Sequence, residues 1–171
     1  MELKTHRRKS RSLHVFPRKH VLILAGGLAL FIDTNVLVEA TGTGENHAAA
    51  QRSLWRIAQR GRNCISRQVL REYLATVTRP RGHGERNPMP IHLALENVRY
   101  FELQYRVLES RPRITRGLVD LVPEVPLRGT QIHDVNIVAT MLAYNIRQVL
   151  TFDRHFQHFT RWVEILHPED I

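Results

Sequence analysis

Short apolar runs recur along the chain and predict β-strands. Residues 28–32 form an unbroken apolar run, which indicates a strand buried on both faces, as in a parallel sheet covered by helices. Three further runs have strand length and polar borders: residues 63–66, 106–108 and 148–151. Residues 162–166 alternate between apolar and polar positions, which is typical of an edge strand.

Helical spacing fills the intervals between these runs. Its clearest example extends from Val135 to Ile146, where apolar residues follow the i, i+3, i+4, i+7 pattern without a gap. Four more helices are predicted over residues 47–60, 67–78, 91–101 and 114–122. Strands that alternate with helices predict an α/β fold, in which helices flank a mostly parallel sheet of about four or five strands.

Three aspartates stand at the ends of these predicted elements. Asp33 and Asp153 each follow an apolar strand directly, and Asp134 stands at the amino end of the long periodic helix. In open parallel sheets, ligands bind outside the carboxyl ends of the strands. The amino end of a helix tolerates a carboxylate and favours nearby phosphate. We therefore expect the three carboxylates to converge on one crevice.

Carboxylates held close together repel each other and take up protons unless a cation compensates them. The sequence has no Cys/His ligand pattern, so the expected ligands are oxygens and the expected cation is hard, Mg²⁺ or Mn²⁺. Such an ion can activate water and stabilise charge on a phosphodiester. The residues alone thus favour metal-assisted phosphodiester hydrolysis.

Three stretches of the chain also resemble PIN domains. LFIDTNVLVEA resembles their opening strand, SRQVLREYL their glutamate helix, and GTQIHDVNIVATMLAYNIRQVLTFDRHF their closing stretch. The matches keep the family's order and spacing and extend from about Leu28 to the C-terminus. The layout is most similar to the VapC toxins of bacterial VapBC toxin–antitoxin systems. The resemblance implies a PIN-like fold.

The resemblance also implies roles for individual residues. Asp33 and Asp134 match metal-binding carboxylates, and Glu72 matches an acidic ligand on the second helix. Asp153 matches the fourth acidic position, which contacts the metal through water. Many relatives have an acidic residue where this chain has His155, so a fifth acidic ligand is in doubt.

Thr34 and Asn35 match the polar pair beside the first aspartate of the family. Their hydroxyl and amide would orient that carboxylate or a substrate phosphate. The implied activity is Mg²⁺- or Mn²⁺-dependent endonucleolytic cleavage of RNA, such as tRNA or rRNA, by a toxin. A VapB-like antitoxin and a homodimer are further expectations from the resemblance.

Each carboxylate has a structural interpretation as well. Asp33, Asp134 and Asp153 can cap a turn or a helix, and Glu72 lies away from the centre of its helix's apolar stripe, where it can be solvated. One shared site explains all four positions at once. Two other functions stay open, a housekeeping PIN-like nuclease and a non-catalytic RNA-binding module.

Composition and charge refine this picture. The 171 residues suit a single domain. The net charge of +9 is unevenly distributed along the chain, because residues 1–20 hold seven of the 25 Lys and Arg residues and only one Glu. We therefore expect a disordered basic extension over 1–20, which an upstream choice of start codon would explain, and one PIN-like nuclease domain over 21–171. Basicity gives the domain itself only moderate support for a nucleic-acid partner.

The single cysteine, Cys64, suits a core position and a reducing compartment. The apolar segment 21–32 imitates a secretory signal but is shorter than the roughly 20 residues of a bilayer span. We therefore expect a cytoplasmic protein without a membrane segment.

Other polar and aromatic residues carry weaker expectations. His133, beside Asp134, can serve a local structural role, donate a proton or contact phosphate. The loop arginines Arg79, Arg81 and Arg86 can touch RNA or only solvent. Trp55 and Trp162 are expected in the core or in an interface rather than as base-stacking platforms.

Overall fold

The computed structural model describes residues 29–59, 61–80 and 87–171. The expectations for the basic extension 1–20, for the first part of segment 21–32, and for Arg81 and Arg86 lie outside the described residues. Within the described part, no helix has the length and apolar character needed to cross a membrane.

Five strands form one sheet, and every strand pair in it is parallel. The spatial order is β3-β2-β1-β4-β5. The strands are β1 (Leu30–Ile32), β2 (Asn63–Ser66), β3 (Arg106–Leu108), β4 (Gln148–Leu150) and β5 (Glu164–Leu166). All residues of β1 and β2 are buried, whereas the edge strand β5 has none that is fully buried. The predicted fold class and the strand positions are therefore confirmed.

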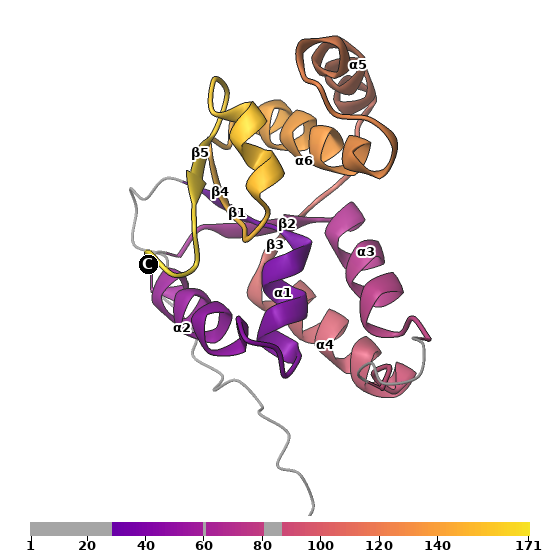
Figure 1. The fold of residues 1–171 in the computed structure, drawn as a ribbon, viewed down its shortest axis with the longest axis vertical. Coiled ribbons are helices and arrows are strands. Elements are labelled where there is room, and N and C mark those ends of the chain that lie inside the picture. The colour runs from indigo at the N-terminus through magenta and orange to yellow at the C-terminus, as the bar shows by residue number, and fades with distance from the viewer. Residues whose placement is uncertain (1–28, 60, 81–86) are drawn as a thin grey trace, which may run out of the picture.

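Helices occupy the connections between the strands. The α-helices are α1 (Thr34–Thr41), α2 (His47–Ala58), α3 (Arg67–Val77), α4 (Ile91–Gln104), α5 (Pro112–Leu121) and α6 (Ile132–Ala143). Three short 3₁₀ helices are η1 (Val122–Glu124), η2 (Gly129–Gln131) and η3 (Arg154–Phe159). Figure 1 shows α5 and α6 above the sheet, and α1, α2 and α4 below it. Right-handed crossovers explain this division. From β1 to β3 the chain moves along the sheet in one direction, and from β3 to β4 it moves back in the opposite direction. Crossovers of the same hand that run in opposite directions place their helices on opposite faces of the sheet.

Apolar residues from both helix layers meet on the central strands. Phe31 and Ile32 of β1 are completely buried, as are Val135 and Val138 of the periodic helix α6. Cys64 is also buried and lies in β2, as expected for a core residue. Burial of such side chains supplies most of the free energy that holds the two layers on the sheet.

The sheet order places a switch point at β1, which has β2 on one side and β4 on the other. The crossovers leave β1 and β4 toward opposite faces of the sheet, so a crevice forms at their carboxyl ends. Asp33 follows β1 immediately, and its backbone N–H donates to the Leu150 carbonyl of β4 at 3.1 Å. The crevice is therefore where the fold brings the chain segments of the predicted site together.

Some elements differ from the sequence prediction. Helix α1 was not predicted, because three of its four apolar residues are consecutive, at 36–38, and its eight residues are too few to show a helical period after the preceding strand. Helix α4 extends three residues beyond 101, through Gln104, and α5 begins at Pro112, two residues early. Trp55 is 62% exposed, so of its two expected positions, the core or an interface, the core is excluded.

Candidate metal centre

Asp33 is the most rigidly held carboxylate of the predicted site. It caps α1, where one oxygen, Oδ1, accepts a hydrogen bond from the Thr34 backbone N–H at 2.6 Å. The other oxygen, Oδ2, accepts from the Thr151 hydroxyl and from the Asn35 amide, each at 2.6 Å. Only 4% of the residue is exposed. The carboxylate therefore has a fixed orientation at the end of β1.

Thr151 links the ends of β1 and β4. Its hydroxyl donates to Asp33 and accepts from the Asn35 amide at 3.0 Å and from the Asp153 backbone N–H at 2.9 Å. Asn35 completes the link, because its side-chain oxygen accepts from the Phe152 backbone N–H at 3.1 Å. A single buried hydroxyl thus sets the positions of two acidic residues from distant segments.

Glu72 enters the crevice from α3 and is held by uncharged donors. Thr34 Oγ1 donates to Glu72 Oε2 at 2.8 Å, and Gln68 Nε2 donates to Glu72 Oε1 at 2.6 Å. The His133 ring nitrogen Nδ1 lies 3.4 Å from the same Oε1. Gln68 also donates to the His133 carbonyl at 3.0 Å and accepts from the Asn136 amide, which ties α3 to α6.

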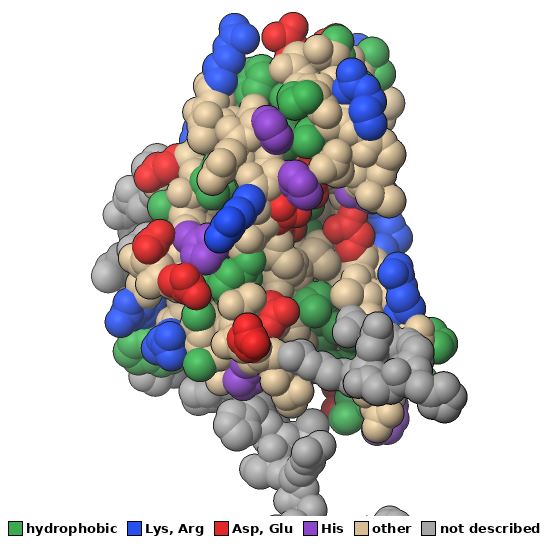
Figure 2. All heavy atoms as spheres, viewed as in Figure 1, with side chains coloured by type: hydrophobic (Ala, Val, Ile, Leu, Met, Phe, Trp, Pro, Cys, Tyr) green, Lys and Arg blue, Asp and Glu red, His purple; other side chains and the backbone are tan. Residues whose placement is uncertain are grey.

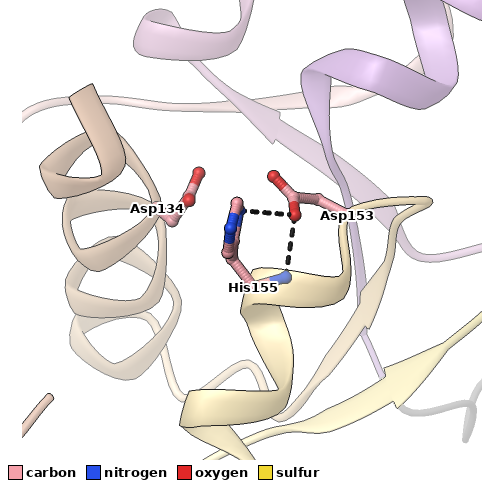
Figure 3. A group of neighbouring side chains, drawn as sticks. All are labelled: Asp134, Asp153 and His155. Atoms are coloured by element: carbon pink, nitrogen blue, oxygen red, sulfur yellow. Dashed lines mark hydrogen bonds and ion pairs between the residues drawn. The ribbon is translucent and has the colours of Figure 1, made fainter. Parts of the chain in front are cut away.

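Asp134 and Asp153 face each other across the crevice (Figure 3). Asp134 is the third residue of α6, and Asp153 precedes η3 and caps it by accepting from the His155 backbone N–H at 2.8 Å. The His155 ring nitrogen Nδ1 lies 3.0 Å from Asp153 Oδ1. One ligand atom from each of Asp134, Asp153 and His155 lies within 4.8 Å of the others. On the face of the molecule drawn in Figure 2, acidic and histidine side chains lie near the middle, where the surface is hollowed.

The electrostatics of the four carboxylates show that they share one environment. Burial is the main cause that raises the pKa of Asp33 to about 7, and the charges of Glu72 and Asp153 raise it further, against the hydrogen bonds that lower it. Burial also raises the pKa of Asp134 to about 7, with added effects from Asp33, Asp153 and Glu72. A cation among these side chains would remove the repulsion and keep them ionised.

The donor set fits a hard divalent cation. Carboxylate oxygens are the ligands that Mg²⁺ and Mn²⁺ prefer, and the group formed by Asp134, Asp153 and His155 adds a single imidazole to two carboxylates. Asp134 has no hydrogen-bond donor among the described residues, so its oxygens are free for a cation. The Asp134, Asp153 and His155 group can hold a metal ion, with Asp33 and Glu72 adding negative charge beside it.

The structure thus brings all four predicted carboxylates into one crevice, together with Thr34 and Asn35. Sequence reasoning missed Thr151, Gln68 and Asn136, and it saw His155 only as a departure from the family pattern. Gln68 lies one helical turn before Glu72, a spacing that could have identified it as a partner of that carboxylate. Thr151 and Asn136 gave no such signal, because an uncharged polar residue inside an apolar element is compatible with many roles.

The model of one protein family matches this sequence over residues 30–161, and its description is PIN domain. The chain belongs to the PIN domain family. The matched stretch contains all four carboxylates of the crevice. Among curated proteins, no sequence matches this chain.

Solved structures similar to this PIN domain include VapC and Fit toxins. VapBC2 from Rickettsia felis, bound to a DNA fragment from its promoter, is 16% identical, with a TM-score of 0.61, over 82% of this chain and 98% of that chain. VapC20 from Mycobacterium tuberculosis, a sarcin-ricin loop cleaving toxin, is 17% identical, with a TM-score of 0.61, over 80% and 97%. FitAcB from Neisseria gonorrhoeae is 16% identical, with a TM-score of 0.60, over 83% and 99%. At these identities the likeness establishes the fold alone.

Proposed function

We propose that this PIN domain is an Mg²⁺- or Mn²⁺-dependent endoribonuclease and the toxin of a type II toxin–antitoxin system. The observation that carries the proposal is the meeting of Asp33, Glu72, Asp134 and Asp153, from four separate segments, in one crevice. Two of them have a pKa raised to about 7 by burial and by the other carboxylates. Such a cluster is costly without a cation, and structural capping gives no reason to assemble it.

Asp33, Glu72, Asp134 and Asp153 would hold the ion, with Asp134 and Asp153 close to each other and His155 within reach of the same position. A divalent ion, when bound, supplies Lewis acidity, which activates water and neutralises charge that develops on a phosphodiester. The protein's own contribution is orientation. Thr151 and Asn35 fix Asp33 Oδ2, and Thr34 fixes one oxygen of Glu72, so the carboxylates need little reorganisation when substrate arrives.

His133 is exposed, and its ring nitrogen Nδ1 lies 3.4 Å from the Glu72 carboxylate. Its backbone carbonyl accepts from Gln68, so the residue has a structural role in joining α6 to α3. In our proposal the imidazole also orients Glu72 by pairing with it. This assigns His133 a positioning role rather than proton transfer.

The proposed partners are an RNA substrate, a VapB-like antitoxin and a second copy of this chain. Solved relatives that are toxin–antitoxin complexes, such as VapBC2 from Rickettsia felis and a complex from Klebsiella pneumoniae, support the antitoxin. VapC20 is described as a sarcin-ricin loop cleaving toxin, which supports RNA as the substrate class. The homodimer rests on resemblance to the VapC toxins.

The test is cleavage of total bacterial RNA by the purified full chain, with mapping of the new ends. Wild type, Asp134→Asn and the control Asp120→Asn, an exposed aspartate on α5, are compared with Mg²⁺ or Mn²⁺ and with chelator. Wild type and Asp120→Asn should produce the same discrete ends only with metal, and Asp134→Asn should produce none. Equal cleavage by Asp134→Asn, or cleavage that persists in chelator, would contradict the proposal.

A further inference from the structure

Three arginines surround one tyrosine ring away from the carboxylates. The guanidinium carbons of Arg111, Arg113 and Arg106 lie 4.6, 5.4 and 5.8 Å from the centre of the Tyr144 ring. Arg106 begins β3, Arg111 caps α5, Arg113 lies in its first turn, and Tyr144 caps the carboxyl end of α6. All three arginines are exposed. We call these four residues the arginine–tyrosine cluster.

The positive charge of this cluster is not compensated within the described part of the chain. There, none of its three arginines forms an ion pair with a carboxylate. Glu109 is the nearby acidic residue, since its carbonyl accepts from the Tyr144 hydroxyl at 2.9 Å, but its carboxylate is bound by Arg67 at 2.8 Å. Like charges held on one ring repel each other, and a polyanion would relieve that repulsion.

A surface cavity leads from the cluster toward the carboxylates. Its volume is about 80 Å³, and Arg111 lines it together with Arg71, Thr115, Gln68 and Asn136. Gln68 is the residue that donates to Glu72, so the far wall of the cavity is also the support of the metal centre. Arg71 is a further exposed arginine without an ion pair among the described residues. A strand bound in the crevice can therefore continue over this cavity to the cluster.

We propose that the arginine–tyrosine cluster binds the phosphate backbone of the RNA substrate on the side of the crevice where the cavity lies. The guanidinium fork matches phosphate oxygens in a bidentate way, which an ammonium group does not. Tyr144 holds the forks side by side through cation–π contacts, and its hydroxyl is anchored to Glu109. An acidic protein segment would also be attracted, but continuity with a phosphodiester-cleaving centre favours RNA. The proposal rests on the proposed ribonuclease function.

The test measures RNA binding by fluorescence anisotropy, with the full chain in chelator so that no cleavage occurs. The probe is a fluorescein-labelled single-stranded RNA of mixed sequence, about 20 nucleotides long, titrated at several KCl concentrations. The variant R106A/R111A/R113A is compared with R52A/R56A/R99A, which removes the same charge from exposed positions on α2 and α4. Figure 1 shows those helices on the other side of the sheet from α5 and α6.

The cluster variant should bind about tenfold more weakly, and the slope of log K against log salt should fall by about 2, as three lost contacts to single-stranded RNA require. The control should change the affinity less than about threefold. R106K/R111K/R113K keeps the charge and should lose affinity to an intermediate degree, which gives a result even where the alanine variant does not fold. Equal losses in the two alanine variants would overturn the proposal.

A fluorescein-labelled oligo-glutamate peptide tests whether the cluster binds an acidic protein segment instead of RNA. Loss of peptide binding with unchanged RNA binding in R106A/R111A/R113A would also overturn the proposal. The outcome is independent of the cleavage test: a chain that binds RNA through the cluster but cuts none contradicts only the ribonuclease function. A cluster variant that cuts RNA with wild-type KM contradicts only the role of the cluster.

Discussion

The Thr34 hydroxyl donates a 2.8 Å hydrogen bond to Glu72 Oε2, although 38 residues separate the two in sequence. Thr34 is the first residue of α1 and Glu72 lies in the second turn of α3, so the bond joins the two helices beside the crevice. From the helix pattern alone, Glu72 was the weakest of the four carboxylates. Its hydrogen bonds to Thr34 and Gln68 explain why it turns toward the site rather than toward solvent.

Replacement of Thr34 by valine removes this bond and keeps the shape of the side chain. Partners that orient a metal ligand typically change metal affinity by about 10-fold or more, so Thr34→Val should bind Mn²⁺ about 10-fold more weakly. Thr34→Ser retains the hydroxyl and should bind as wild type does. Titration calorimetry with Mn²⁺ makes the comparison, and equal affinities for the valine and serine variants would show that the bond does not position Glu72.

Thr151→Val should destabilise the fold as well as the site. The buried Thr151 hydroxyl serves Asp33, Asn35 and the Asp153 backbone N–H, and valine would leave these groups without that partner. Loss of a buried hydrogen-bond partner costs about 1–3 kcal/mol. Urea denaturation in chelator should show this loss for Thr151→Val and a smaller one for Thr151→Ser. A valine variant as stable as wild type would mean that water replaces the hydroxyl at no cost.

The raised pKa values of Asp33 and Asp134 predict how stability depends on pH. Both carboxyls move from an ordinary pKa of 3.8 to about 7 in the folded chain. Between these values the folded state binds more protons than the unfolded state, so the free energy of unfolding falls as pH rises. The contribution of the two groups is complete below pH 4 and is lost as pH rises through 7.

Asp134→Asn removes one of these titrations and one repelling charge. In chelator, its melting temperature should exceed that of wild type by about 2–4 °C at pH 8, as expected for about 1 kcal/mol in a chain of this size, and the excess should shrink toward pH 5. Differential scanning calorimetry across this range measures the effect. The Mn²⁺ affinity of wild type should rise as the pH increases from 5 to 8, because metal binding displaces protons. A variant less stable than wild type at pH 8 would contradict the repulsion on which the prediction depends.

His155 should influence which metal is preferred. An imidazole ligand favours Mn²⁺ over Mg²⁺ more than a carboxylate does, and His155 lies with Asp134 and Asp153 in the group that can hold an ion. His155→Ala should therefore lower Mn²⁺ affinity by about 10-fold and Mg²⁺ affinity by much less. The neighbouring His158, which is exposed and outside this group, gives the matched control His158→Ala. Equal losses for both metals would show that the imidazole only pairs with Asp153.

Local rules were sufficient to predict the sheet and three of the four carboxylates, whereas Glu72 was predicted only from the resemblance to PIN domains. Apolar runs marked β1 and β2, and acids at the ends of strands and helices marked Asp33, Asp134 and Asp153. Helix α1 was hidden, since it is only eight residues long and three of its four apolar residues are consecutive, which gives no helical period. Contacts that form only in the folded chain were also hidden. Gln68 and Thr151 became visible as supports of Glu72 and Asp33 only when distant segments were brought together.

Mn²⁺ titration calorimetry of the full chain at pH 8 shows whether Asp33, Glu72, Asp134 and Asp153 share a divalent ion. The compared proteins are wild type, Asp33→Asn, Asp134→Asn and the exposed control Asp120→Asn. Wild type and Asp120→Asn should bind Mn²⁺ alike, whereas Asp33→Asn and Asp134→Asn should lose at least about 10-fold in affinity. Unchanged binding in the two site variants, or no binding by folded wild type, would contradict a shared ion.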